Sequence, residues 1–264
     1  MAKRSPKIYK QAFLTGCDYK TEWMLEWFVD NFRLENPTIP LVFADFGVKP
    51  ETLKKIKQSN AIHAVMDFSK EKGMGWFLKP LAMLNCPAEY TVWIDTDCEV
   101  LGNLNGIFKH IVPHKLSMVE DRPWSKRRQE LWHNSGVVGF HMKPEILKAW
   151  WGAVKKNPQV GDQEVLHSIL DPLAKLTYIE ELPNIYNWLR LQLQHDNQDN
   201  PEKLVMHWTG QKGKDIIRTL VKDQYEYVAP DPKKFGAIPP PKDRLRASNL
   251  DQVFRNTIEE ENGD

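Results

Sequence analysis

Two aspartates one residue apart, Asp95 and Asp97, carry the clearest chemical signal in the chain. The preceding residues 91–94 are β-branched, aromatic or apolar, which is typical of a buried strand. Carboxylates at the carboxyl end of such a strand lie at the edge where open α/β sheets bind ligands. Because unpaired buried carboxylates are costly, we expect a hard divalent cation with a phosphorylated ligand beside them. The alternative is an acidic turn in which Asp97 caps a backbone N–H.

Alternating strand-like and helix-like stretches must position this motif. Strands are expected at residues 11–15, 41–44, 61–66 and 91–100, and helices at 21–36, 51–58 and 76–84. This order predicts an α/β fold, a single domain with a mainly parallel central sheet flanked by helices. Right-handed crossovers then bring Asp18, Asp45 and Asp95 to one edge, although Asp45 is interpreted as a turn residue outside the site.

The second half of the sequence is less regular. We expect strands at residues 116–119 and 203–206, a charged loop at 120–132, a loop leading into a strand at 134–140, and helices at 144–155, 162–170 and 215–221. Asp162 is expected to cap its helix after the turn residue Gly161. The predicted organisation is a basic segment at 1–10, one domain at 11–229, and a Pro-rich linker and polar tail at 230–264 with a docking helix at 250–258.

Composition limits the function classes. The 264 residues carry a formal net charge of +1, which argues against a general polyanion binder but allows a local basic patch. The three cysteines have no paired spacing, and no signal peptide precedes them, so a reducing, cytoplasmic environment is expected. No stretch approaches the roughly 20 apolar residues of a membrane span.

Five short motifs follow one another along residues 11–214. They are Phe13-Leu14-Thr15-Gly16 with Tyr19, Ile94-Asp95-Thr96-Asp97, Asn134-Ser135-Gly136, Gly161-Asp162-Gln163, and His207-Trp208-Thr209-Gly210. Their order resembles that of glycogenin-like, family-8-type glycosyltransferases of the GT-A (Rossmann-like) fold. The resemblance implies a nucleotide-sugar donor, usually UDP-linked, held through a divalent ion that is commonly Mn²⁺.

The resemblance and the chemistry agree on a metal site. Breaking a sugar–diphosphate bond develops negative charge on the leaving group, and Mn²⁺ or Mg²⁺ on its oxygens stabilises that charge. Asp97 is the expected main ligand, Asp95 a ligand that also touches the ribose, and His207 the third protein ligand.

Further residues are implied for the rest of the donor. Tyr19 stacks on the uracil, and Thr15 and Asp18 bond the base or ribose. The expected residues near the diphosphate are Lys79, Gly210, Lys212 and Lys214; the family's usual lysine position is taken by Gly213, so either neighbouring lysine serves.

The donor sugar is expected to contact Asn134, Ser135, Asp162 and Gln163, whose polar side chains can form hydrogen bonds with sugar hydroxyls. The resemblance implies retention of anomeric configuration, with Asp162 or Gln163 near the anomeric carbon and a diphosphate oxygen accepting the acceptor's proton.

The acceptor and two rival functions stay open. Trp124, Trp132, Trp188 and Trp208 fall in the half where an acceptor would bind, and Lys126-Arg127-Arg128 suits an anionic acceptor or a solvated loop. A glycan, a protein, a lipid head group or modified nucleic acid are the acceptor classes, and the oligomeric state is undetermined. The rival functions are a haloacid-dehalogenase-like phosphatase that uses the Asp-x-Asp, and a non-catalytic nucleotide-sugar or carbohydrate-binding module.

Overall fold

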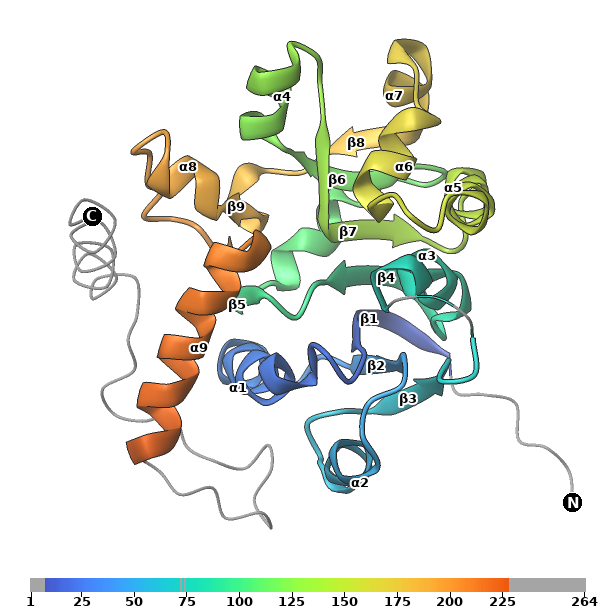
Figure 1. Cartoon of the computed structure of the whole chain (residues 1–264). Coiled ribbons are helices and arrows are strands. Elements are labelled where there is room, and N and C mark those ends of the chain that lie inside the picture. Colours follow the sequence, from blue (N-terminus) through green and yellow to red (C-terminus); the bar gives the residue numbers. More distant parts are fainter. Residues whose placement is uncertain (1–7, 72, 74, 228–264) are drawn as a thin grey trace, which may run out of the picture.

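A seven-stranded sheet forms the centre of the protein (Figure 1). The structure is a computed structural model and describes residues 8–71, 73 and 75–227. The sheet has the order β3-β2-β1-β4-β7-β6-β8. Its strands are β1 (Tyr9–Cys17), β2 (Leu41–Asp45), β3 (Ala64–Asp67), β4 (Ala88–Ile94), β6 (Leu116–Glu120), β7 (His133–His141) and β8 (Ile179–Glu181). Only β7 runs against its neighbours, so the prediction of a mainly parallel sheet is confirmed.

Helices cover both faces of the sheet because its strands are apolar on both faces. In β1, Phe13 and Cys17 pack in one core, and Ala12 and Leu14 pack in the other. The first core includes residues of η1 (Glu22–Met24), α1 (Leu25–Glu35), α2 (Pro50–Gln58), η2 (Asn105–His110), η3 (Asn184–Tyr186) and α9 (Gly210–Tyr227). The second includes residues of α3 (Gly75–Asn85), α5 (Glu145–Lys156) and α6 (Asp162–Ser168), with α7 (Pro172–Tyr178) packed against it.

A second, three-stranded sheet joins distant parts of the chain. It consists of β5 (Cys98–Val100), β10 (Val205–His207) and β9 (Trp188–Leu189), and α8 (Arg190–Gln194) follows β9. In the antiparallel pairing of β5 with β10, His207 lies directly opposite Cys98. This register places the last residue of β10 beside the acidic motif.

Two predicted loops are wrong. Within 120–132, residues Arg122–Arg128 form α4, because Asp121 accepts a hydrogen bond from the backbone N–H of Trp124 and Pro123 stands in the first turn. The high charge of this segment favoured the loop prediction, although Asp121 and Pro123 are typical residues for the start of a helix. Residues 134–136 lie within β7, a strand that pairs with β6 and β4, instead of forming a loop.

Other boundaries also differ from the predictions. The acidic motif is the turn between β4 and β5, so residues 91–100 are two strands. Asp162 is the first residue of α6, and Gly161 is its N-cap, so the Asp162 side chain is free for other contacts. Helix α9 begins at Gly210, earlier than predicted. The segment 171–200, which had no assigned elements, contains α7, β8, η3, β9 and α8.

The predicted tail at 230–264, with its helix at 250–258, lies outside the described residues. Among the described helices, none combines the length and the apolar character that a bilayer crossing requires.

Candidate functional site

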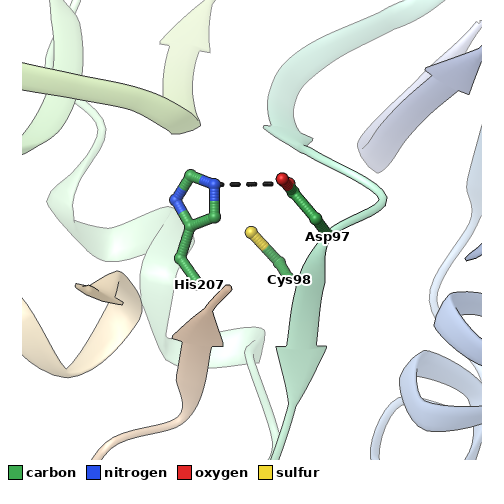
Figure 2. Close-up of side chains that lie close together, drawn as sticks. All are labelled: Asp97, Cys98 and His207. Atoms are coloured by element: carbon green, nitrogen blue, oxygen red, sulfur yellow. Dashed lines mark ion pairs between the residues drawn. The ribbon is translucent and has the colours of Figure 1, made fainter. Parts of the chain in front are cut away.

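Asp97 and His207 form the contact at the centre of the site (Figure 2). Asp97 lies in the turn after β4, His207 ends β10, and Oδ1 of Asp97 is 3.3 Å from Nε2 of His207. Burial opposes ionisation of Asp97, but the nearby imidazolium and its hydrogen bond outweigh burial and lower the pKa of Asp97. Burial also opposes the charged form of His207, yet Asp97 raises the pKa of His207 above its ordinary value.

Asp95 has different partners. Its Oδ1 accepts a hydrogen bond from Nε1 of Trp93 at 2.6 Å and lies 3.0 Å from Nζ of Lys79. Burial raises the pKa of Asp95, and the Lys79 ammonium opposes this effect. Among the described residues, the compact group of possible metal ligands is Asp97, Cys98 and His207, and Asp95 is not part of it. Coordination by Asp95 therefore stays a prediction.

Lys79 links two carboxylates under the acidic turn. Its buried ammonium lies 3.0 Å from both Asp95 and Asp162, and it donates to the backbone oxygen of Ser135 at 3.1 Å. Burial opposes the charge, but the two carboxylates hold the pKa of Lys79 above its ordinary value. These acceptors occupy the three N–H groups, so the predicted bond from Lys79 to donor phosphates requires one contact to be given up.

Asp162 and Gln163 reach different partners from the start of α6. Oδ2 of Asp162 accepts from Oγ of Ser135 at 2.9 Å and also meets Lys79. Oε1 of Gln163 accepts from the Ser135 backbone and from Nδ2 of Asn134, while its Nε2 donates to Asp121. The two predicted catalytic residues are thus held by β7 and by the residue after β6.

Asn134 is occupied by protein contacts, and its expected bond to the donor sugar stays a prediction. Its Nδ2 donates to Asp121 at 3.0 Å and to Gln163 at 3.1 Å. Its Oδ1 accepts from the Gly136 N–H at 2.9 Å and from Nδ2 of Asn187 at 2.9 Å. Both N–H groups are therefore in use, and the oxygen is shared among several protein partners.

Asn134 and Asn187 fix the orientation of His207. Nδ1 of His207 lies 3.1 Å from Oδ1 of Asn134 and 3.1 Å from Oδ1 of Asn187. Because the Gly136 N–H can only donate, the Asn134 atom is an acceptor, so Nδ1 of His207 carries the proton. Nε2 then faces Asp97 as a free ligand atom whenever the ring is neutral.

Gly136 provides the space for this ring. A Cβ at this position would lie 2.1 Å from Cε1 of His207, far inside van der Waals contact. The missing side chain at position 136 therefore makes room for the imidazole.

Two cavities meet at the acidic motif. The first, of about 190 Å³, is lined by Ser135, Asp162, Gln163, His207 and Gly210 together with both aspartates. The second, of about 100 Å³, is lined by Asp18, Lys79 and Lys214 and by the same two aspartates. Most of the predicted residues thus line one of two neighbouring spaces that share Asp95 and Asp97.

The three residues that were predicted to bind the base or ribose lie in three different environments. Thr15 is fully buried, lies outside both cavities, and its Oγ1 has no hydrogen-bond partner among the described residues; its expected contact with the base stays a prediction. Tyr19 is 57% exposed and lines a separate surface hollow. Asp18 does line the second cavity, and its Oδ1 also accepts from Lys20 and Thr21 at the start of η1. Asp45 accepts from the Gly47 and Val48 N–H groups, which confirms a turn role.

The start of α9 explains the missing lysine at position 213. A Cβ on Gly213 would lie 2.1 Å from the backbone oxygen of Trp208, so no side chain fits there. Lys214 lines the second cavity, whereas Lys212 is exposed and lines neither cavity. Of the two lysines, Lys214 is placed for the predicted contact.

Two site residues were not foreseen. Asp121 follows β6 at the same sheet edge as Asp95, so the strand-then-acid pattern could have identified it. Asn187 lies in an irregular connection and had no such signal. Of the four tryptophans expected near the acceptor, only Trp124 lines the first cavity; Trp132, Trp188 and Trp208 are buried.

Comparisons with known proteins decide the fold. Neither the protein-family models nor the curated proteins give a match. Among solved structures, the galactosyltransferase LgtC, in a complex with donor and acceptor sugar analogues, matches with a TM-score of 0.54 and 12% identity, over 80% of this chain and 95% of LgtC. The chain has the GT-A fold.

Two other GT-A structures show the same likeness. The glycosyltransferase GlyE of Streptococcus pneumoniae TIGR4 matches with a TM-score of 0.56 and 14% identity, over 83% of this chain and 64% of GlyE. The bifunctional glycosyltransferase WbbM matches with a TM-score of 0.52 and 10% identity, over 80% of this chain and 47% of WbbM. These TM-scores establish a shared GT-A architecture. Because the sequence identities are low, the activity must be argued from the site.

Proposed function

We propose that this protein is a glycosyltransferase of the glycogenin-like, family-8 type. It moves a sugar from a nucleotide-sugar donor, UDP-linked, to an acceptor. The observation that carries the proposal is the 3.3 Å contact between Asp97 and His207, at the point where two cavities meet on a GT-A sheet. The solved complex of LgtC with donor and acceptor sugar analogues supports the same use of the fold.

The two cavities suit the two ends of the donor. The nucleoside occupies the cavity lined by Asp18 and Lys214, and the sugar occupies the one lined by Ser135, Asp162 and Gln163. The diphosphate then lies between them, beside Asp97. Lys214 and the N-terminal end of α9, which begins at Gly210, both favour negative charge there.

The donor atoms beside the diphosphate fit Mn²⁺ or Mg²⁺. A carboxylate oxygen and an imidazole nitrogen converge from Asp97 and His207, and both ions accept such ligands together with phosphate oxygens. When bound, a divalent cation supplies Lewis-acid neutralisation of the charge on the leaving diphosphate. Asn134 and Asn187 keep Nε2 of His207 turned toward this position.

Asp162 and Gln163 are the residues placed for the reacting sugar. Asp162 accepts from Lys79 and Ser135 through Oδ2, which fixes the carboxylate at the cavity wall. Gln163 is oriented by Asp121, to which its Nε2 donates. In LgtC, a variant that exchanges a glutamine for a glutamate is described as an active-site mutant. We propose retention of anomeric configuration, with a diphosphate oxygen accepting the proton of the acceptor hydroxyl.

Free thiols fit the expected location. All three cysteines are buried and unpaired by disulfides, which supports a reducing, cytoplasmic environment. The acceptor classes remain those predicted from the sequence: a glycan, a protein, a lipid head group or modified nucleic acid.

A thermal-shift screen of nucleotide sugars, with and without Mn²⁺, tests the proposal. We expect one donor class to raise the melting temperature only with the ion, and Asp97→Ala and His207→Ala to abolish the shift. His141→Ala, at the opposite end of β7, is the matched control and keeps it. A phosphatase would instead hydrolyse phosphate esters without any sugar nucleotide, and a binding module would bind the donor without hydrolysis or transfer.

A further inference from the structure

A cysteine thiol lies directly beside the proposed metal ligands. Cys98 is fully buried and follows Asp97 in the sequence, and the β5–β10 register pairs it with His207. Directly paired residues of antiparallel strands project to the same face, with Cβ atoms about 5 Å apart. Figure 2 shows the sulfur of Cys98 between the imidazole ring and the carboxylate. The register of the small sheet therefore brings the thiol to the ion site.

The three side chains have the spacing of a shared coordination sphere. One ligand atom from each of Asp97, Cys98 and His207 lies within 4.8 Å of the other two. In a tetrahedral site with metal–ligand distances of about 2.0–2.3 Å, ligand atoms are roughly 3.5 Å apart. A small closure of the side chains around an ion satisfies that geometry.

We propose that this centre binds a thiophilic divalent ion, Zn²⁺ or Co²⁺, through a carboxylate oxygen of Asp97, the thiolate of Cys98 and Nε2 of His207. The inference rests on the metal site of the proposed function but not on sugar transfer. The ion–sulfur bond forms as the S–H bond breaks, the thiol proton passes to solvent, and no electron is transferred. Asp97 and His207 both line the first cavity, from which a fourth ligand can reach the ion.

The thiol makes the centre discriminate between ions. Mn²⁺ and Mg²⁺ prefer oxygen ligands and leave Cys98 protonated, so only Asp97 and His207 hold them directly. Zn²⁺ gains a third protein ligand and exceeds Mn²⁺ in affinity for nitrogen and sulfur donors. Zn²⁺ therefore displaces Mn²⁺ and inhibits transfer.

Cobalt absorption tests for the sulfur ligand without any assay of transfer. In the full-length chain, we expect Co²⁺ to produce a near-ultraviolet sulfur-to-cobalt charge-transfer band. Cys98→Ser and Cys98→Ala lose the band, and Zn²⁺ affinity, measured by competition with a chromophoric chelator, falls by at least about tenfold. Cys86→Ser is the control, since Cys86 is also buried and free but packs in the core on the opposite face.

The outcomes separate this inference from the proposed function. If Co²⁺ binds the wild type without a charge-transfer band, or if the band survives in both Cys98 variants, the sulfur ligand is refuted. Mn²⁺ binding, followed by electron paramagnetic resonance, reports on the centre itself: it is retained in a folded Cys98→Ala and lost in Asp97→Ala. If the Cys98 variants lose the band but still bind Mn²⁺, the thiolate ligand is supported. If Asp97→Ala binds Mn²⁺ as tightly as the wild type, the proposed metal site itself is refuted.

Discussion

Asn187 offers the sharpest test of how the site is held together. Its Oδ1 lies 3.1 Å from Nδ1 of His207, and its Nδ2 donates to Oδ1 of Asn134 at 2.9 Å. Asn187→Ala removes both hydrogen bonds, each worth about 0.5–1.5 kcal/mol. An imidazole that is held less firmly binds the metal more weakly, because mutating the hydrogen-bond partner of a ligating histidine lowers metal affinity by about 10–100-fold. Two lost bonds at about 1–3 kcal/mol correspond to about 5–150-fold, which agrees with that range.

The assay is a titration with Mn²⁺ followed by electron paramagnetic resonance, with urea unfolding measured in parallel. We expect Mn²⁺ affinity to fall at least about tenfold while the variant stays folded. Asn157→Ala is the control, because Asn157 makes a single exposed contact with Ala153 on α5. An Asn187→Ala variant that loses stability but keeps Mn²⁺ affinity within about twofold would refute the orienting role.

Three further predictions concern charge, space and pH. Lys79→Met leaves the carboxylates of Asp95 and Asp162 without their shared cation and lowers the free energy of unfolding by about 3–5 kcal/mol in urea, whereas Lys10→Met, at an exposed pair, leaves it nearly unchanged. Gly136→Ala forces His207 aside and weakens Mn²⁺ binding in a calorimetric titration, whereas Gly152→Ala, which meets open space, does not. Burial lowers the pKa of His167 in the folded state, against its hydrogen bond with Glu130, so the unfolded chain binds more protons. His167 should therefore contribute a fall in unfolding free energy as pH drops below about 6.5, and His167→Gln should remove this contribution; equal slopes for the wild type and the variant in urea titrations at several pH values would refute it.

The order of the first four strands could be predicted from the sequence, since each is a short apolar run followed by a turn signal. The carboxyl ends of parallel strands share one edge, which is why Asp95 and Asp97 were found. His207 was found through its motif, and the β5–β10 pairing explains why it lies beside Asp97. These features depend on local patterns and on connection rules.

The roles inside the site depended on contacts that the sequence does not show. Asn134 has an amide that suits a sugar hydroxyl, but four protein partners and His207 occupy it. Thr15 follows the predicted strand pattern, yet its side chain points to the core and away from both cavities. Asn187 reaches His207 from a segment with no regular pattern. Tertiary packing, which brings segments from four parts of the chain together, decides these assignments.

A double-mutant cycle on Mn²⁺ affinity tests the central claim most directly. If Asp97 and His207 bind the same cation, Asp97→Asn and His207→Gln each weaken binding strongly, and the double variant is little worse than either single variant. Wild-type affinity in either folded single variant, or strictly additive losses in the double variant, would contradict a shared ion.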